Sequence, residues 1–369
     1  MQPLRYAVVG AGMMGTEHAI TIAALPDARL VALADPEPRS LAAATRALGP
    51  AAPPVWHDAG RMLADAEPDV VVIATPNHVH DESLAPVLRH GAHVLVEKPL
   101  AVDAARCAAI RNAVRRTEPR IGRGGPRRVV WVGMEYRYMA ATAALIAHVR
   151  AGDVGEPRMV SIREHRFPFL HKVGEWNRFS RNTGGTLVEK CCHFFDLMRR
   201  VTGDEVVAVG ASGGQALNHL DERNGGEVPD LLDHAYVTVE FARGARGMLE
   251  LSMFAEASRN EQEISVVGDA GKVEAFPAEG LVRIGRRERG VLRAPVAERT
   301  VAQPEGILPG MHHGATHREH LALARAVRDG REAEVCVEDG LAAVAIGEAA
   351  HRAILERRMV AVAVPPAQG

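Results

Sequence analysis

The sequence has few cysteines, little net charge and no long apolar run, and each absence excludes a class of protein. Only four of the 369 residues are cysteine, without the spacing of a disulfide framework, which favours a cytoplasmic protein. A formal net charge of −2 predicts no general attraction to nucleic acid or to an anionic membrane. No stretch approaches the roughly 18 uninterrupted apolar residues of a membrane span, and we expect no signal peptide.

The composition that remains is that of a globular protein with more than one domain. Hydrophobic residues make up 47% of the chain and charged residues 24%. Because 369 residues are too many for one ordinary hydrophobic core, two domains are expected. We place the boundary where the pattern of the chain changes, giving residues 1–134 and 135–369. No internal repeat is visible.

The first half alternates between apolar runs and helix-like segments. Strands are predicted at 4–9, 30–34, 70–74, 93–96 and 129–132, and helices at 14–25, 39–48, 82–89 and 103–116. Alternation of this kind indicates an α/β domain with a parallel, doubly wound sheet. The Arg- and Gly-rich segment 117–128 is predicted to be a solvated loop.

The second half is different, because its strands follow one another through short turns. Strands are predicted at 159–164, 206–211, 235–241, 247–253, 263–267 and 272–275, and helices at 140–150, 187–201, 317–328 and 338–357. This order predicts an α+β domain with a mostly antiparallel sheet.

A glycine-rich turn follows the first predicted strand. Gly10 permits a tight turn, Gly12 allows the backbone to approach a pyrophosphate, and Gly15 allows close helix packing. Asp35 ends the second strand, where a carboxylate can accept hydrogen bonds from ribose hydroxyls and repel a 2′-phosphate. It therefore favours NAD over NADP, although Asp35 is also a good turn residue and Arg39 lies nearby. The residues assigned to NAD here are Gly10, Gly12, Met13, Met14, Gly15 and Asp35.

Two further polar segments follow buried strands and should lie at the same edge of the sheet. Thr75, Asn77 and His80 follow the strand at 70–74, where they can form a cofactor wall or simply cap a helix. Glu97 and Lys98 follow the next strand. We assign all five to the cofactor side of the site, and we expect Glu135 to border the nicotinamide.

These motifs, with a third segment, resemble those of the glucose–fructose oxidoreductase and inositol dehydrogenase (Gfo/Idh/MocA) family. The matching pieces are the glycine turn, Thr75 to His80, Glu97-Lys98-Pro99-Leu100 and the segment from Gly184 to Asp196. The resemblance implies a Rossmann domain, an open antiparallel sheet that often packs against another subunit, and hence a homodimer or homotetramer. It also implies that the Lys98–Pro99 peptide is cis. One departure is that Glu189 stands where the family usually has aspartate.

The third segment supplies the chemistry that oxidation of a secondary alcohol needs. His193 has an ordinary pKa of about 6.5, which suits a base that accepts the hydroxyl proton. Lys98 can donate to the same oxygen and stabilise the developing alkoxide. Glu189 lies four residues before His193 on one predicted helix, so it can orient the imidazole, stabilise its cation or hold a substrate hydroxyl. Asp196, one turn further, is expected to bind a second hydroxyl.

A loop rich in hydrogen-bond donors surrounds one indole ring between residues 165 and 182. Trp176 offers an apolar surface for the C–H face of a ring, and Asn177 and Arg178 offer donors for its hydroxyls. His312, His313 and His317 come later, but no cysteine or carboxylate shares a metal-ligand spacing with them, so we expect no metal.

The sequence thus predicts a cytoplasmic NAD-dependent oxidoreductase of a sugar, inositol or related cyclic polyol. Lys98, His193 and Glu189 are the predicted catalytic residues. The predicted substrate contacts are Lys98, Trp176, Asn177, Arg178, Glu189, His193 and Asp196. Two alternatives remain open: a glycosidase that uses NAD for transient oxidation, and a regulator that binds NAD without catalysis.

Overall fold

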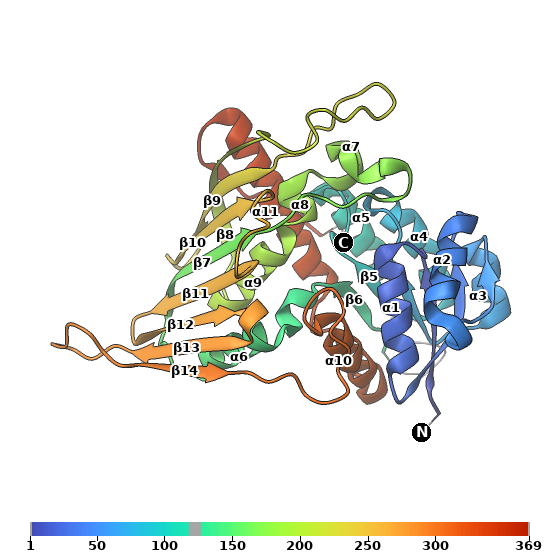
Figure 1. Ribbon diagram of the computed structural model, residues 1–369, viewed down its shortest axis with the longest axis horizontal. Coiled ribbons are helices and arrows are strands. Elements are labelled where there is room, and N and C mark those ends of the chain that lie inside the picture. The colour runs from blue at the N-terminus through green and yellow to red at the C-terminus, as the bar shows by residue number, and fades with distance from the viewer. Residues whose placement is uncertain (1, 118–126, 368–369) are drawn as a thin grey trace.

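The computed structural model describes residues 2–117 and 127–367, and it contains two sheets (Figure 1). The predicted loop at 117–128 therefore lies almost entirely outside the described residues. One sheet is parallel and belongs to the first half of the chain, and the other is mostly antiparallel and belongs to the second. The predicted fold class is confirmed.

Six strands form the first sheet, and helices follow most of them. The strands are β1 (Leu4–Val9), β2 (Ala28–Ala34), β3 (Val55–Trp56), β4 (Val70–Ile73), β5 (His93–Glu97) and β6 (Val130–Gly133). The helices are α1 (Met13–Ala24), α2 (Pro38–Leu48), α3 (Ala59–Ala66), α4 (His80–His90) and α5 (Ala104–Arg116). The spatial order β3-β2-β1-β4-β5-β6 reverses direction between β1 and β4, where doubly wound sheets bind their ligands.

The carboxyl ends of these strands bring the predicted motifs to one edge. Gly10 follows β1, Asp35 follows β2, Thr75 follows β4, Lys98 follows β5 and Glu135 lies two residues beyond β6. The central strands are fully buried and rich in Val and Ile, as strands covered on both faces require. Because both faces of the sheet are buried, a ligand can reach the sheet only at an edge. The candidate site therefore lies at the edge formed by the carboxyl ends of the strands.

Nine strands form the second sheet. In chain order they are β7 (Pro157–His165), β8 (Val206–Gly214), β9 (His234–Phe241), β10 (Arg246–Ser252), β11 (Gln262–Gly268), β12 (Gly271–Phe276), β13 (Leu281–Arg286), β14 (Val296–Thr300) and β15 (Val360–Ala361). Their spatial order is β14-β13-β12-β11-β7-β10-β9-β8-β15, and among the described strands of this sheet only β7 and β10 pair in parallel.

One face of this sheet is covered by helices and the other is open (Figure 1). The covering helices are α6 (Ala140–Arg150), α9 (Cys192–Thr202) and α11 (Val337–Glu356). Along β7, β9 and β10 the residues alternate, with Ile162, Val237 and Leu249 buried toward those helices. Met159 and Tyr236 are exposed on the opposite face, where no described helix lies.

The helix predicted over 187–201 is two helices, which corrects the prediction. α8 (Thr186–Glu189) ends before Lys190, and α9 begins at Cys192. A short helix α7 (Ser180–Thr183) precedes them. The sequence shows no proline or glycine at this break, so its pattern alone favours one helix.

Several short elements are absent from the sequence-based prediction. α3 and β3 occupy a segment assigned no structure, and β13, β14 and β15 extend the second sheet. All residues of β14 are exposed, so this strand lacks the alternating pattern by which strands are recognised.

The two late helices connect the halves. α10 (Ala315–Asp329) packs against α1, and α11 packs against α5 as well as against α9 (Figure 1). The backbone of Val132 also donates a hydrogen bond to Val335. The boundary at 134/135 remains a prediction, but the end of the chain packs on both halves and brings residues of α10 close to the predicted site.

Candidate active site

The glycine turn between β1 and α1 has the shape that a pyrophosphate requires. Gly10 has a φ of +94°, and a Cβ there would lie 2.5 Å from the carbonyl oxygen of Ala74. A Cβ on Gly15 would lie 1.8 Å from the carbonyl oxygen of Gly10. A Cβ on Gly12 would meet nothing within 4 Å, and no side chain caps the N-terminus of α1. The free N–H groups of this helix therefore face open space, which fits a dinucleotide phosphate.

Asp35 lies against the glycine turn. Its Oδ2 accepts a hydrogen bond from the backbone N–H of Ala11 at 2.7 Å, and its Oδ1 accepts one from Glu37 at 2.8 Å. The side chain is half-buried, so it remains accessible beside the place where the adenosine ribose would lie. The position is consistent with both the ribose role and the turn role.

The residues after β4 differ in whether their side chains are used inside the protein. Asn77 is buried and its Nδ2 has no hydrogen-bond partner among the described residues, so it is free to donate to a cofactor. Thr75 is half-buried and bonds Ser83. His80 is fully buried, and its two ring nitrogens face the carbonyl oxygens of Thr75 and Pro99 at 3.0 and 2.9 Å. The ring thus connects the segment after β4 to the Lys98–Pro99 segment. Both ring nitrogens are used inside the protein, which argues against the cofactor contact predicted for His80.

Glu97 also has an internal role. One carboxylate oxygen is 2.8 Å from Nε2 of His18, and the other accepts the backbone N–H of Lys98 at 3.0 Å. His18 in turn contacts His320 of α10. This buried chain ties α1, β5 and α10 together, so the Glu97 carboxylate is not available to the cofactor.

Lys98 lies at the centre of the site, after a cis peptide bond to Pro99 as the family resemblance implies. Its Nζ donates to the backbone carbonyl of Glu189 at 3.2 Å. Burial opposes the charge, but the acidic side chains of Cys192, Glu97, Glu189 and Glu135 outweigh it and raise the pKa of Lys98 above its ordinary value. Lys98 therefore carries a charged ammonium group.

The break between α8 and α9 makes that contact possible. The N–H groups of Phe194 and Phe195 bond the carbonyl of Cys191, and no backbone N–H of the described residues, that of His193 included, bonds the carbonyl of Glu189. The carbonyl of Glu189 is thus free to accept from Lys98 and, at 3.6 Å, from the thiol of Cys192. A continuous helix would have used this carbonyl internally.

His193 is a buried, neutral imidazole at the start of α9. It is 2% exposed, and its ring stacks on Tyr136 with centroids 4.1 Å apart and planes 6° apart. Burial, and then the charges of Lys98 and Lys190, lower the pKa of His193 well below its usual value. Nδ1 has no hydrogen-bond partner among the described residues, so this atom is open to a substrate hydroxyl.

The carboxylate beside His193 is Glu135, not Glu189. Glu135 Oε1 lies 3.7 Å from His193 Nε2 and 3.4 Å from His312 Nδ1. The Glu189 carboxylate instead lies 3.8 Å from Nζ of Lys172, and its Oε2 has no hydrogen-bond partner among the described residues. The Glu189 carboxylate is therefore not placed to orient the imidazole. Sequence reasoning placed Glu135 beside the nicotinamide but missed its position next to His193.

The loop before α7 places one of its three predicted contacts at the site. Nζ of Lys172 lies 4.7 Å from the centre of the Trp176 ring, whose other neighbour is the His78 ring at 6.0 Å. Trp176 is half-buried. Since Lys172 also faces Glu189, it links the indole to the catalytic segment.

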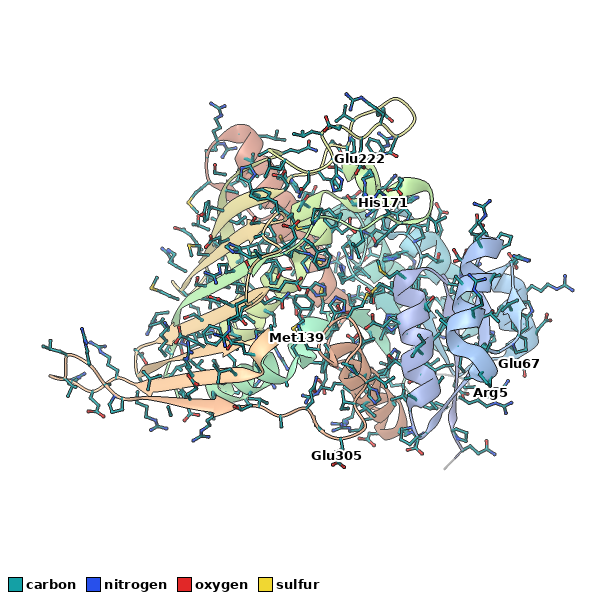
Figure 2. All side chains as sticks on the ribbon, viewed as in Figure 1. Arg5, Glu67, Met139, His171, Glu222 and Glu305 are labelled. Atoms are coloured by element: carbon teal, nitrogen blue, oxygen red, sulfur yellow. The ribbon has the colours of Figure 1, made fainter. Side chains whose placement is uncertain are left out.

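Asn177 and Arg178 are structural residues of this loop. Asn177 is fully buried and donates to the carbonyl of Leu170, while Arg178 is fully buried and pairs with Glu222 at 2.7 Å. Figure 2 shows His171 and Glu222, two of the groups that Arg178 contacts, beside each other at one end of the molecule. The donors of both side chains are used within the protein, which argues against the substrate contacts predicted for Asn177 and Arg178.

Asp196 is likewise engaged inside the protein. It is fully buried, and its two carboxylate oxygens accept hydrogen bonds from Nε and Nη2 of Arg137. Arg137 also pairs with Asp339 at 3.2 Å. This bidentate pair joins the segment after β6 to α9, and it replaces the second-hydroxyl role predicted for Asp196.

Replacing Asp196 by asparagine is expected to destabilise the fold rather than change substrate recognition. The change leaves the buried Arg137 guanidinium short of its main partner, which costs about 3–5 kcal/mol of unfolding free energy. Urea denaturation measures this loss. Glu227→Gln, which breaks the exposed pair with Arg181, should leave stability unchanged. A stable Asp196→Asn variant with a raised KM would restore the substrate role.

The buried histidines predict a loss of stability in mild acid. Burial lowers the pKa of seven described histidines, which are His80, His93, His193, His312, His317, His320 and His351. The pKa falls to about 4 for His93 and to about 3 for His312. Below about pH 6.5 the unfolded chain binds protons that these rings do not, so stability is present above that pH and lost as pH falls. Each ring contributes up to about 1.4 kcal/mol per pH unit.

Buried carboxyl groups whose pKa is raised act in the opposite sense but are fewer. Burial raises the pKa of Glu135, Glu164, Asp196 and Glu319, which adds stability in acid. Urea midpoints at pH 7.5, 6.5 and 5.5 should therefore fall steadily. The slope should shrink in His320→Gln but not in His57→Gln, whose side chain is exposed. A midpoint independent of pH would contradict this account.

The described residues show neither a metal-binding cluster nor a membrane-spanning helix. Among residues 2–117 and 127–367, no group of three or more His, Cys, Asp or Glu side chains is arranged to hold a metal ion. No helix in the same residues is long and apolar enough to cross a membrane.

Comparison with known proteins defines the class and then the family. A family model described as the NAD-binding Rossmann fold of an oxidoreductase family matches residues 4–124, and one described as its C-terminal alpha/beta domain matches residues 146–362. The protein is therefore an oxidoreductase with an NAD-binding domain. It belongs to the Gfo/Idh/MocA oxidoreductase family.

Individual relatives match three quarters of the chain or more at modest identity. Inositol 2-dehydrogenase of Rhizobium meliloti is 28% identical over 98% of this chain and 99% of its own. scyllo-Inositol 2-dehydrogenase (NAD(+)) of Bacillus subtilis is 28% identical over 76% of this chain and 74% of its own. A levoglucosan dehydrogenase solved with NADH and levoglucosan superposes with a TM-score of 0.83 at 22% identity, over 98% of this chain and 100% of that one, and so shares the fold.

Proposed function

We propose that this protein interconverts a secondary alcohol and a ketone on a sugar, inositol or related cyclic polyol, using NAD. The observation that carries the proposal is the pairing of a charged Lys98 with a neutral, buried His193 at the edge where the glycine turn lies. A cationic donor and a neutral acceptor are the two groups that an alcohol oxidation requires.

The chemistry divides among the residues of the site. Bound NAD supplies a hydride acceptor at its nicotinamide ring. The open Nδ1 of His193 accepts the hydroxyl proton, and Nζ of Lys98 donates to the same oxygen as negative charge develops on it. The stacked ring of Tyr136, itself bonded by Lys190 at 2.5 Å, holds the imidazole in place. Preorganised groups of this kind lower the barrier without reorganising during the reaction.

A ring with several hydroxyls fits the surroundings of this pair. Glu189 presents an unpartnered carboxylate oxygen to a hydroxyl, and Trp176 presents an apolar face to ring C–H groups. The inositol dehydrogenases among the relatives are named for substrates of this class. Asp35 at the glycine turn supports NAD over NADP.

The open face of the second sheet supports a homodimer or homotetramer. Met159, Tyr236 and Met248 are exposed there beside charged pairs such as Arg163–Glu263. An exposed sheet face that combines large apolar and paired charged side chains is typical of a subunit interface. The cytoplasm is the compartment we propose, since it supplies NAD and keeps the four cysteines reduced.

A screen for NADH formation tests the proposal. Inositols, aldoses, anhydrosugars, amino-sugars and glycosides are each offered with NAD and with NADP. We expect turnover of at least one polyol, with kcat/KM for NAD about tenfold or more above that for NADP. Equal use of NADP would exclude the role of Asp35. Release of an aglycone without accumulation of NADH would favour the glycosidase instead.

A further inference from the structure

The carboxyl group of Glu135 has an environment that the roles of Lys98 and His193 do not explain. It is fully buried, and neither of its oxygens has a hydrogen-bond partner among the described residues. A buried polar group without a partner is costly and therefore calls for an explanation. One of its oxygens, Oε1, lies between two imidazole rings, 3.7 Å from Nε2 of His193 and 3.4 Å from Nδ1 of His312.

The groups around Glu135 make its carboxylate a stronger proton acceptor than that of an ordinary glutamate. Burial has the largest effect, and the carboxylates of Glu97 on β5 and Glu319 on α10 add to it, so the pKa of Glu135 is raised well above its usual range. Glu17 on α1 acts in the same direction and Lys98 acts against it. The two histidines face the same carboxyl from α9 and from the loop before α10.

His193 cannot keep a proton that it accepts. Burial and the charges of Lys98 and Lys190 lower the pKa of its ring, and the side chain is 1% exposed, so the proton has no direct route to water. An acceptor must therefore lie within the protein. Glu135 is the described carboxylate within 4 Å of this ring.

His312 lies on the outward side of Glu135. Its side chain is 21% exposed, against none for Glu135. Burial lowers the pKa of His312 to about 3, so its ring is neutral at ordinary pH and holds a proton only transiently. Of these three side chains, His312 is therefore the one in contact with solvent.

We propose that Glu135 and His312 form a proton exit for the oxidation performed at His193. The inference rests on the proposed function. The substrate O–H bond breaks and its proton goes to Nδ1 of His193, and bound NAD would supply the acceptor for the hydride that carries away the C–H electron pair. The proton on Nε2 then passes to Oε1 of Glu135, on to Nδ1 of His312, and to water. One proton is released for each NADH formed, and ketone reduction runs the path inward.

The two distances on this path are longer than hydrogen bonds. Catalytic hydrogen bonds are often long before the substrate is bound, so a small movement of either ring completes the path. A second explanation is that Glu135 and His312 bind another hydroxyl of the substrate, and the variants below separate the two.

The first experiment needs no substrate. The carboxyl of Glu135 is followed in the full-length protein by infrared difference spectra of protein labelled with carboxyl-13C glutamate, with Glu135→Gln to identify its band. We expect this band to titrate well above the ordinary carboxyl pKa of about 4.3. His312→Asn should shift its midpoint, whereas His313→Asn should not. An ordinary midpoint, or one insensitive to His312→Asn, overturns the proposal.

The second experiment compares NADH formation with proton release in stopped flow, using absorbance and a pH indicator. We expect Glu135→Gln to lower kcat about tenfold to a hundredfold and to delay proton release behind NADH, with KM nearly unchanged. Glutamine can still form a hydrogen bond with a substrate hydroxyl, but it cannot accept a proton. If proton release by Glu135→Gln is not delayed behind NADH formation, with or without a raised KM, the relay is overturned. If wild type oxidises no polyol, the proposed function fails, and the infrared titration alone decides whether Glu135 and His312 are coupled.

Discussion

Replacing Lys98 by methionine is expected to lower kcat/KM for polyol oxidation by about two to three orders of magnitude. Methionine keeps most of the apolar chain but removes the ammonium that would donate to the developing alkoxide. The loss should appear mainly in kcat, because the charge on the reacting oxygen develops only in the transition state. Steady-state kinetics give kcat and KM, and fluorescence titration gives the affinity for NAD.

The same substitution at two other lysines shows whether the effect of Lys98→Met is specific to that position. Lys272→Met alters an exposed residue of β12 and should leave the kinetics unchanged. Lys172→Met removes the partner of Glu189 and Trp176, so it should raise KM more than it lowers kcat. If Lys98→Met kept near wild-type turnover with NAD still bound, Lys98 would have no catalytic role.

Replacing Gly15 by alanine is expected to destabilise the first domain and abolish measurable NAD binding. The new Cβ would lie 1.8 Å from the carbonyl oxygen of Gly10, and backbone cannot move aside as a flexible side chain can. Overpacking against backbone costs about 3 kcal/mol or more. Urea denaturation and NAD titration measure the two effects.

Gly12→Ala is the matched control in the same turn. A Cβ there meets no protein atom within 4 Å and the backbone is not in the left-handed region, so stability should be unchanged. The methyl group would instead occupy space needed by the pyrophosphate, weakening NAD by about tenfold or more, which is about 1.4 kcal/mol. Unchanged NAD affinity in Gly12→Ala would mean that the dinucleotide does not lie on this turn.

The motifs that carry the site were predictable because each is local. A glycine turn after a buried strand and a lysine at the end of another strand require only the strand pattern to place them at one sheet edge. His193 was found in the same way, from a segment with glycines before it. In the structure, Lys98 donates to the carbonyl of Glu189, and Nδ1 of His193 has no hydrogen-bond partner among the described residues.

The partners of these residues were less predictable. His312 is more than a hundred residues from His193 in the sequence, and Glu135 looks in the sequence like the end of a strand. Asp196 looked like a ligand because it shares a helix face with His193, yet Arg137 reaches it from the segment after β6. Polar residues of a helix give no sign of which distant charge will neutralise them.

The sequence by itself determined the two kinds of sheet, the glycine turn and the presence of Lys98 and His193, because strand periodicity and turn chemistry act over a few neighbouring residues. Only the tertiary structure decided which carboxylate faces the imidazole. The break between α8 and α9 frees the Glu189 carbonyl for Lys98, and its carboxylate lies beside Lys172. The packing of α10 against α1 brings His312 to Glu135, since contacts between distant segments depend on how whole elements pack.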